Sequence, residues 1–157
     1  MSEHTARIHW QLSNGDFLRG RYSRVHSWTF DGGVVVTASP SPANVPAPWS
    51  NAAHVDPEEA FVASIASCHM LTFLYLASRA GVEIVEYDDE AVGTMSAGEN
   101  GTPWVSRVDL RPRIRFATAS APLAEQLAVL HEQAHADCFI ANSVRTRIVV
   151  TPRMPAG

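Results

Sequence analysis

The sequence predicts an α+β fold in a single domain, residues 1–157. Runs rich in β-branched and aromatic residues occupy both ends of the chain, as is typical of strands. Between them, Ala60 to Ala77 is apolar over the length of a long helix, and a second helical pattern follows later. A chain of 157 residues has the usual size of one domain and can bury a substantial core.

The composition limits both the environment and the partners of the protein. Hydrophobic residues make up 46% and charged residues 18%, which excludes a disordered chain and favours a surface partly covered by a second subunit. The net charge of −4 and the lack of a Lys/Arg cluster argue against nucleic acid. The start, "MSEHTARIHWQL", is polar where a secretory signal is apolar, so we expect a cytoplasmic protein.

The first third of the chain predicts a hairpin or meander of strands. "RIHWQL", then Tyr22 to Phe30, then "VVVTAS" have strand composition, and "DGG" supplies a turn between the last two. The Pro-rich stretch "SPSPANVPAPWS", from Ser39 to Ser50, predicts an extended loop.

The long apolar run carries the start and stop signals of a helix. Asp56 suits the N-cap, Pro57 the first helical position, and Glu59 completes a capping box, while Gly81 can end the helix. Because the run is apolar on nearly every side, we expect a central helix that is covered all round. Four polar side chains within it argue against a membrane span: Ser64, Ser67, His69 and Thr72.

The second half predicts further strands and one more helix. "AVGTMS" reads as a strand, and the alternation of apolar and charged residues from Val108 to Phe116 predicts one strand with a wet face. A helix is expected from about Pro122 towards Cys138, and "RTRIVV" gives a last strand. The expected apolar face of this helix is Leu123, Leu127, Leu130 and Ala134.

The two cysteines, Cys68 and Cys138, are more consistent with thiols than with a disulfide framework. A cysteine is a strong nucleophile only as thiolate, so a reactive thiol needs a nearby cation or hydrogen-bond donors. A zinc site is an alternative, because His131, His135 and Cys138 follow helical i, i+4, i+7 spacing and Cys68 could be the fourth ligand. Asp137 argues against it as a residue that ends the helix. Besides reactive thiols and a zinc site, a third hypothesis is a binding protein whose two cysteines have no redox activity.

The motif "DPEEAFVASIASC", followed about seventy residues later by "HADCFIANSV", resembles the OsmC/Ohr family of thiol-dependent peroxidases. The resemblance implies an OsmC-like fold, with strands packed around the central helix, and an intertwined homodimer with active sites at the interface. It implies that Cys68 is the peroxidatic thiol, Cys138 the resolving thiol and Glu58 the acid of a "PE" motif. The expected reaction is reduction of organic hydroperoxides, with hydrogen peroxide as a second substrate, at the expense of a small dithiol or thiol. No cofactor and no metal are expected.

The family also supplies an activating Arg from its N-terminal strands, held by the motif's Glu. "RGRYSRVHSW" offers Arg19, Arg21 and Arg24, of which Arg24 is favoured because it lies nearest the "FDGG" turn. Glu58 precedes Cys68 by ten residues, or roughly 15 Å along a straight helix, so the two cannot touch within that helix. Either the Arg bridges the gap, or Glu58 reaches the thiol of the other subunit, which the interface sites of the family favour.

Two expectations concern the surroundings of the thiols. His69 stands where the family commonly has an aromatic residue, which leaves open whether it packs, donates to the peroxide or titrates near Cys68. An apolar lining is expected from Phe61, Ile65, Phe139 and Ile140.

Overall fold

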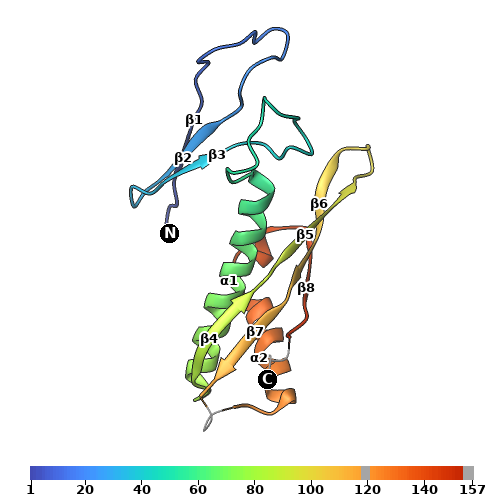
Figure 1. Cartoon of the computed structure of the whole chain (residues 1–157). Coiled ribbons are helices and arrows are strands. Elements are labelled where there is room, and N and C mark those ends of the chain that lie inside the picture. Colours follow the sequence, from blue (N-terminus) through green and yellow to red (C-terminus); the bar gives the residue numbers. More distant parts are fainter. Residues whose placement is uncertain (118–120, 154–157) are drawn as a thin grey trace. The chain divides into compact units, whose positions relative to one another are not determined.

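The first three strands form an antiparallel meander, as predicted. In the computed structural model, which describes residues 1–117 and 121–153, β1 (Ala6–His9), β2 (His26–Phe30) and β3 (Val35–Ala38) pair in that order (Figure 1). Gly33 has a φ of 83°, which favours glycine, and its N–H donates to the Phe30 carbonyl to close the "DGG" turn. The chain divides into two compact units, residues 1–60 and 61–157, which are described in turn.

The N-terminal unit has shorter strands than the sequence suggests, because residues 10–25 form a loop with its own aromatic cluster. Trp10, Phe17 and Tyr22 contact one another with ring centroids 4.8–5.8 Å apart. The Trp10 indole N–H also donates to the Ser23 carbonyl. The Pro-rich stretch Ser39–Ser50 contains neither helix nor strand, which confirms the predicted loop.

Helix α1 (Pro57–Arg79) begins and ends at the predicted signals. The Glu59 N–H donates to Asp56 Oδ1 over 2.7 Å, and the Asp56 N–H donates to Glu59 Oε2 over 3.0 Å, so the capping box is complete. At the other end Gly81 has a φ of 73°, and the Val82 N–H bonds the Ala77 carbonyl.

Within one chain, α1 is buried along a single row and not all round. Ile65, His69, Phe73 and Ala77 recur every four residues and are 0–1% exposed, whereas Leu71 is 61% exposed. The expected full coverage is therefore not reached by one chain alone. The length and hydropathy of α1 would also suit a membrane span, but a core helix of a soluble protein meets the same test.

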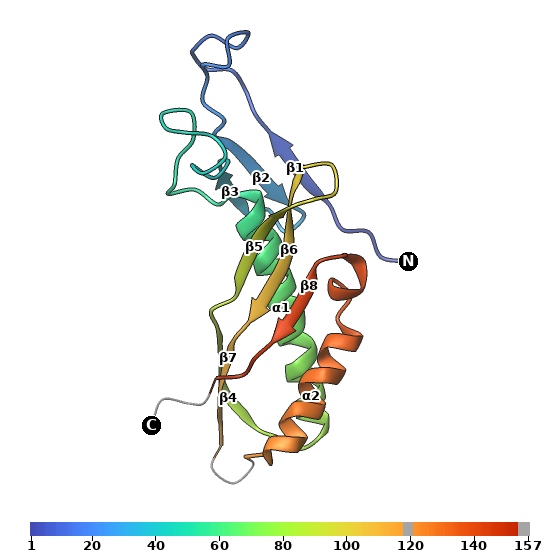
Figure 2. The ribbon, with the colours of Figure 1, turned by 90° about the vertical axis from the view of Figure 1, so that its right-hand side faces the viewer.

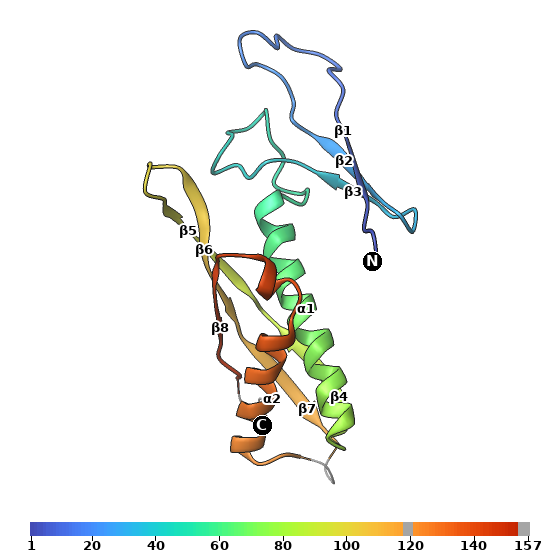
Figure 3. The same ribbon diagram turned by 180° about the vertical axis from the view of Figure 1, so that it is seen from behind.

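The C-terminal unit places both helices on one face of its strands (Figures 1 and 3). β4 (Ile84–Asp89) pairs with β7 (Pro112–Phe116), while β5 (Val92–Ala97), β6 (Pro103–Leu110) and β8 (Arg147–Val150) form a second sheet. β6 and β8 run parallel, and the other pairs are antiparallel. Helix α2 (Ala124–Asp137) lies beside α1, and a short 3-10 turn, η1 (Ala141–Ser143), leads to β8 (Figure 2).

The core of this unit is built from the inner row of α1. Phe73 and Ala77 pack with Ile114 and Ala134, and Ile65 packs with Val108 and Leu110. On α2, Leu127, Leu130 and Ala134 face this core as predicted, but Leu123 precedes the helix and is 71% exposed.

The run from Val108 to Phe116 is two strands, which corrects the prediction of one. The break falls at Arg111, because Pro112 has no N–H to continue a ladder, and the Arg111 N–H instead donates to Asp89 Oδ1 over 2.6 Å. The alternation itself holds, since Val108, Leu110 and Ile114 are all buried.

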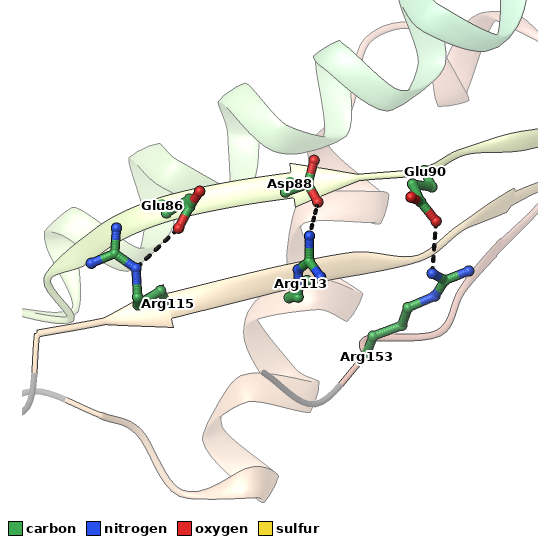
Figure 4. A network of polar contacts seen from close by, with 6 residues as sticks. All are labelled: Glu86, Asp88, Glu90, Arg113, Arg115 and Arg153. Carbon is green, nitrogen blue, oxygen red and sulfur yellow. Dashed lines mark hydrogen bonds and ion pairs between the residues drawn. The ribbon is translucent and has the colours of Figure 1, made fainter. Parts of the chain in front are cut away.

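The exposed face of the β4–β7 ribbon carries two ion pairs, Glu86–Arg115 and Asp88–Arg113, and a third pair, Glu90–Arg153, lies just beyond the end of β4 (Figure 4). The first two join residues that are directly opposite in the strand register. Exposed pairs contribute little to stability. If β7 slipped by one residue against β4, the opposite charges would no longer face each other. The ion pairs therefore favour the observed register.

Candidate active site

The structure brings the two cysteines of the C-terminal unit together. Cys68 lies on α1 and Cys138 directly after α2, and their Sγ atoms are 2.7 Å apart although the residues are 70 positions apart in sequence. Both are free thiols. The two sulfurs that the sequence predicts to react therefore lie in contact.

The end of α2 positions Cys138. The helix ends before Cys138, as expected, but Asp137 is its last helical residue and Cys138 is the C-cap, with an extended ψ of 116°. The Asn142 side-chain amide donates to the carbonyls of Ala136 and Cys138 over 2.7 and 3.0 Å, which satisfies two of the carbonyls left open where the helix ends.

The two sulfurs have unequal surroundings. Cys138 is 1% exposed and Cys68 is half-buried, so Cys68 is the more accessible nucleophile. Burial, followed by the hydrogen bond to Cys68, raises the pKa of the Cys138 thiol. Cys138 therefore keeps its proton, and its S–H donates a hydrogen bond to Cys68 Sγ.

Main-chain amides also point at the thiols. The Ile140 N–H donates to Cys68 Sγ over 3.5 Å, and the Ala141 N–H donates to Cys138 Sγ over 3.4 Å. Such donors favour a thiolate over a thiol. Sequence reasoning missed these donors, because the tight turn through η1 that aims them at sulfur has no strong sequence signal.

His69 points away from the thiols and into the core. Its Nε2 lies 3.1 Å from Nδ1 of His131 on α2, and the His131 ring stacks on Phe73 with centroids 4.3 Å apart. Burial lowers the pKa of each histidine from 6.5 to about 4, so both rings are neutral at pH 7. Of the three roles left open for His69, the structure favours packing.

The residues of the zinc hypothesis do not converge. His131 is 4% exposed and hydrogen-bonded to His69, whereas His135, one turn later on α2, is exposed, and Cys138 lies beyond the helix. Among the described residues, no group of three or more His, Cys, Asp or Glu side chains is arranged to hold a metal.

Arg24 is the best anchored of the three candidate arginines in the N-terminal unit. Its guanidinium donates to the carbonyls of Tyr22 and Gly20 over 2.8 and 3.1 Å and lies 4.1 Å from the centre of the Tyr22 ring. Arg19 instead forms an ion pair with Asp16 and is 74% exposed. Arg21 contributes main-chain bonds to Asp16.

Glu58 also belongs to the N-terminal unit. Its Oε1 accepts a hydrogen bond from the Asn44 side chain over 3.1 Å. Its Oε2 is buried and has no partner among the described residues. One carboxylate oxygen is thus positioned while the other remains available to a cation.

The predicted apolar lining is partly wrong. Ile65 is fully buried in the core and cannot face a substrate, and Phe139 is 83% exposed. Phe61 and Ile140 are half-buried and pack against the Ile65 core.

Comparisons with known proteins agree with this helix-and-sheet fold. A family model described as OsmC-like protein matches residues 50–153. An OsmC-like protein of unknown function from Vibrio cholerae is 45% identical, with a TM-score of 0.94 over 98% of this chain and 100% of that chain. The chain therefore belongs to the OsmC/Ohr family, which confirms the predicted resemblance.

More distant relatives share the fold. An organic hydroperoxide resistance protein from Elizabethkingia anophelis is 19% identical, with a TM-score of 0.72 over 100% of this chain and 98% of that chain. The organic hydroperoxide resistance protein OhrB of Bacillus subtilis is 21% identical, with a TM-score of 0.61 over 96% and 97%. No curated protein sequence matches the chain.

Proposed function

We propose that the protein is a thiol-dependent peroxidase that reduces organic hydroperoxides through Cys68 and Cys138. The observation that carries the proposal is the contact between two free thiols in unequal environments, with Cys138 donating a hydrogen bond to the more accessible Cys68. The family adds support, since two structural relatives are named organic hydroperoxide resistance proteins.

The chemistry takes place in two steps. The Cys68 thiolate attacks the distal peroxide oxygen, the O–O bond breaks, and the alkoxide leaves as an alcohol after taking a proton, with Cys68 left as sulfenic acid. Cys138 then attacks the Cys68 sulfur, so that an S–S bond forms and the hydroxyl leaves as water. A small dithiol or thiol returns the disulfide to two thiols by exchange.

Arg24 and Glu58 are proposed to complete the site from a second subunit. The anchored guanidinium of Arg24 is suited to stabilise the Cys68 thiolate, and the unpartnered oxygen of Glu58 is suited to hold that guanidinium. Glu58 precedes Cys68 by ten residues, or about 15 Å along a straight helix, so the two side chains cannot touch within that helix.

The homodimer that this requires is supported by the exposed face of α1. Leu71 and Tyr75 lie one turn apart on the apolar helix α1, and each is 61% exposed. Covering them with a second copy would bury apolar surface that one chain leaves in water. We expect the protein to work in the cytoplasm, where small thiols are available as reductants.

Stoichiometric oxidation tests the proposal directly. One equivalent of cumene hydroperoxide should consume both thiols and produce a Cys68–Cys138 disulfide within one chain, detected by alkylation and mass spectrometry. Metal-free protein should react at the same rate, because no step uses a metal. Two alkylated cysteines after this treatment would rule out the peroxidase and favour a binding protein on the same fold.

A further inference from the structure

The α1–α2 contact contains a buried polar bond at a position where apolar side chains would suffice for burial. His69 is 1% exposed, His131 is 4% exposed, and their rings are parallel to within 5°. On the same interface Phe73 and Ala77 of α1 meet Ala134 of α2 through apolar contacts alone.

This bond is costly to keep. One ring donates and the other accepts, which leaves His69 Nδ1 and His131 Nε2 buried without partners among the described residues. Desolvation keeps both rings neutral. Two leucines would bury a similar volume without unpaired polar atoms, so the pair does not maximise stability.

A hydrogen bond is directional, whereas apolar contacts tolerate sliding. A displacement of one helix along the other by about 1 Å preserves most apolar contacts but lengthens and bends, and so weakens, a hydrogen bond of 3.1 Å between fixed rings. The pair therefore sets the axial position of α2 on α1 more precisely than the surrounding leucines and alanines.

The position of α2 determines where Cys138 lies. Cys138 is the C-cap of α2, two turns after His131, and Cys68 is the residue before His69 on α1. A shift of α2 would move the Cys138 sulfur relative to the Cys68 sulfur by a similar amount. Disulfide formation is sensitive to such shifts, because it requires both sulfurs at about 2.05 Å in a defined geometry.

We propose that His69 and His131 are positioning residues that hold the resolving thiol Cys138 against Cys68 through their hydrogen bond. This inference rests on the proposed function in that it takes the two thiols to be a redox pair. It predicts that loss of the bond weakens disulfide formation more than it weakens the fold.

The test measures the equilibrium between the Cys68–Cys138 dithiol and disulfide in mixtures of reduced and oxidised dithiothreitol, with no peroxide present. His69→Leu and His131→Leu should each lower the equilibrium constant for disulfide formation about tenfold, or about 30 mV for this two-electron couple. His135→Leu is the matched control, because His135 is exposed on the same helix, and it should leave the constant unchanged.

Two conservative variants restore the bonding atoms. Glutamine can place an amide where His69 Nε2 lies, and asparagine can place one where His131 Nδ1 lies. His69→Gln and His131→Asn should therefore stay within about twofold of the natural equilibrium constant. Both are also expected to fold if the single leucine variants do not.

The double variant His69→Leu/His131→Leu separates positioning from stability. Because both polar groups are removed together, its urea midpoint should recover towards that of the natural protein. Its equilibrium constant should remain low, because the directional bond is still absent. If the constant recovers with the midpoint, or if the single leucine variants keep the natural constant, the inference is wrong.

Oxidation with one equivalent of cumene hydroperoxide gives the kinetic counterpart. The leucine variants should form Cys68 sulfenic acid as fast as the natural protein but leave more of it to be trapped by dimedone. A protein that ignores hydroperoxide but shows the predicted equilibrium shifts would refute the proposed function and support the positioning role. A natural protein whose thiols never form a disulfide with oxidised dithiothreitol would overturn the positioning role itself.

Discussion

Acidification should weaken the fold through the same two histidines. The pKa values of His69 and His131 fall from 6.5 to about 4 on folding, so between these pH values the unfolded chain binds more protons than the folded chain. The free energy of unfolding then rises with pH across this window. The stability that depends on keeping these two imidazoles neutral is fully present above pH 6.5 and is lost as the pH falls towards 4.

The size of the effect follows from the shifts. For one histidine with these two pKa values, moving from pH 7.5 to pH 4.5 lowers the free energy of unfolding by about 2.5 kcal/mol. Two independent histidines would give about 5 kcal/mol, close to the whole stability of many small domains. Repulsion between the two charged rings makes the second proton harder to bind in the folded state.

Urea unfolding followed by circular dichroism at several pH values measures this effect, at a fixed protein concentration in case dissociation is coupled to unfolding. The His69→Leu/His131→Leu variant retains every carboxylate, so its curve gives the acid sensitivity from all other groups. The natural protein should lose at least about 2 kcal/mol more than this variant between pH 7.5 and pH 4.5. Equal losses in the two proteins would show that the imidazoles are not buried as neutral groups.

Further variants test the proposed site. Cys68→Ser should abolish hydroperoxide consumption, whereas Cys138→Ser should react once and leave a sulfenic acid on Cys68 that dimedone can trap; equal partial losses would contradict the assigned order. Arg24→Gln should slow alkylation of Cys68 by iodoacetamide at pH 7 about tenfold, while Arg19→Gln, at an exposed position, should match the natural protein. A heterodimer of Cys68→Ser and Glu58→Gln chains, formed by refolding them together, should recover about one working site. Activity no higher than half that of the Glu58→Gln homodimer would refute a site shared between subunits.

Local signals account for the parts of the fold that were predicted well. The start of α1 depends on Asp56, Pro57 and Glu59, which act within one turn, and its end depends on the conformational freedom of Gly81. The "DGG" turn is equally local. The break at Pro112 was missed because the alternation of buried side chains continues through it, although the ladder does not.

The candidate site could be predicted only in part, because its contacts are long-range. The pairing of Cys68 with Cys138 came from the family motif and not from periodicity. The partner of His69 lies 62 residues away and has no marker in the sequence. The sequence does not distinguish between Arg19, Arg21 and Arg24. The structure does, because the Arg24 guanidinium contacts the Tyr22 ring and two main-chain carbonyls.

The geometry of α1 explains why a thiol and an imidazole stand next to each other in an apolar helix. Successive residues are about 100° apart around a helix, so Cys68 and His69 point in different directions. His69 belongs to the buried row with Ile65 and Phe73, whereas Cys68 lies at the edge of that row and stays half-buried. The same helical turn thus contacts α2 through His69 and leaves the Cys68 sulfur accessible. At position 69 the thiol would lie in the core, and at position 68 the imidazole would lie only at the half-buried edge of the row.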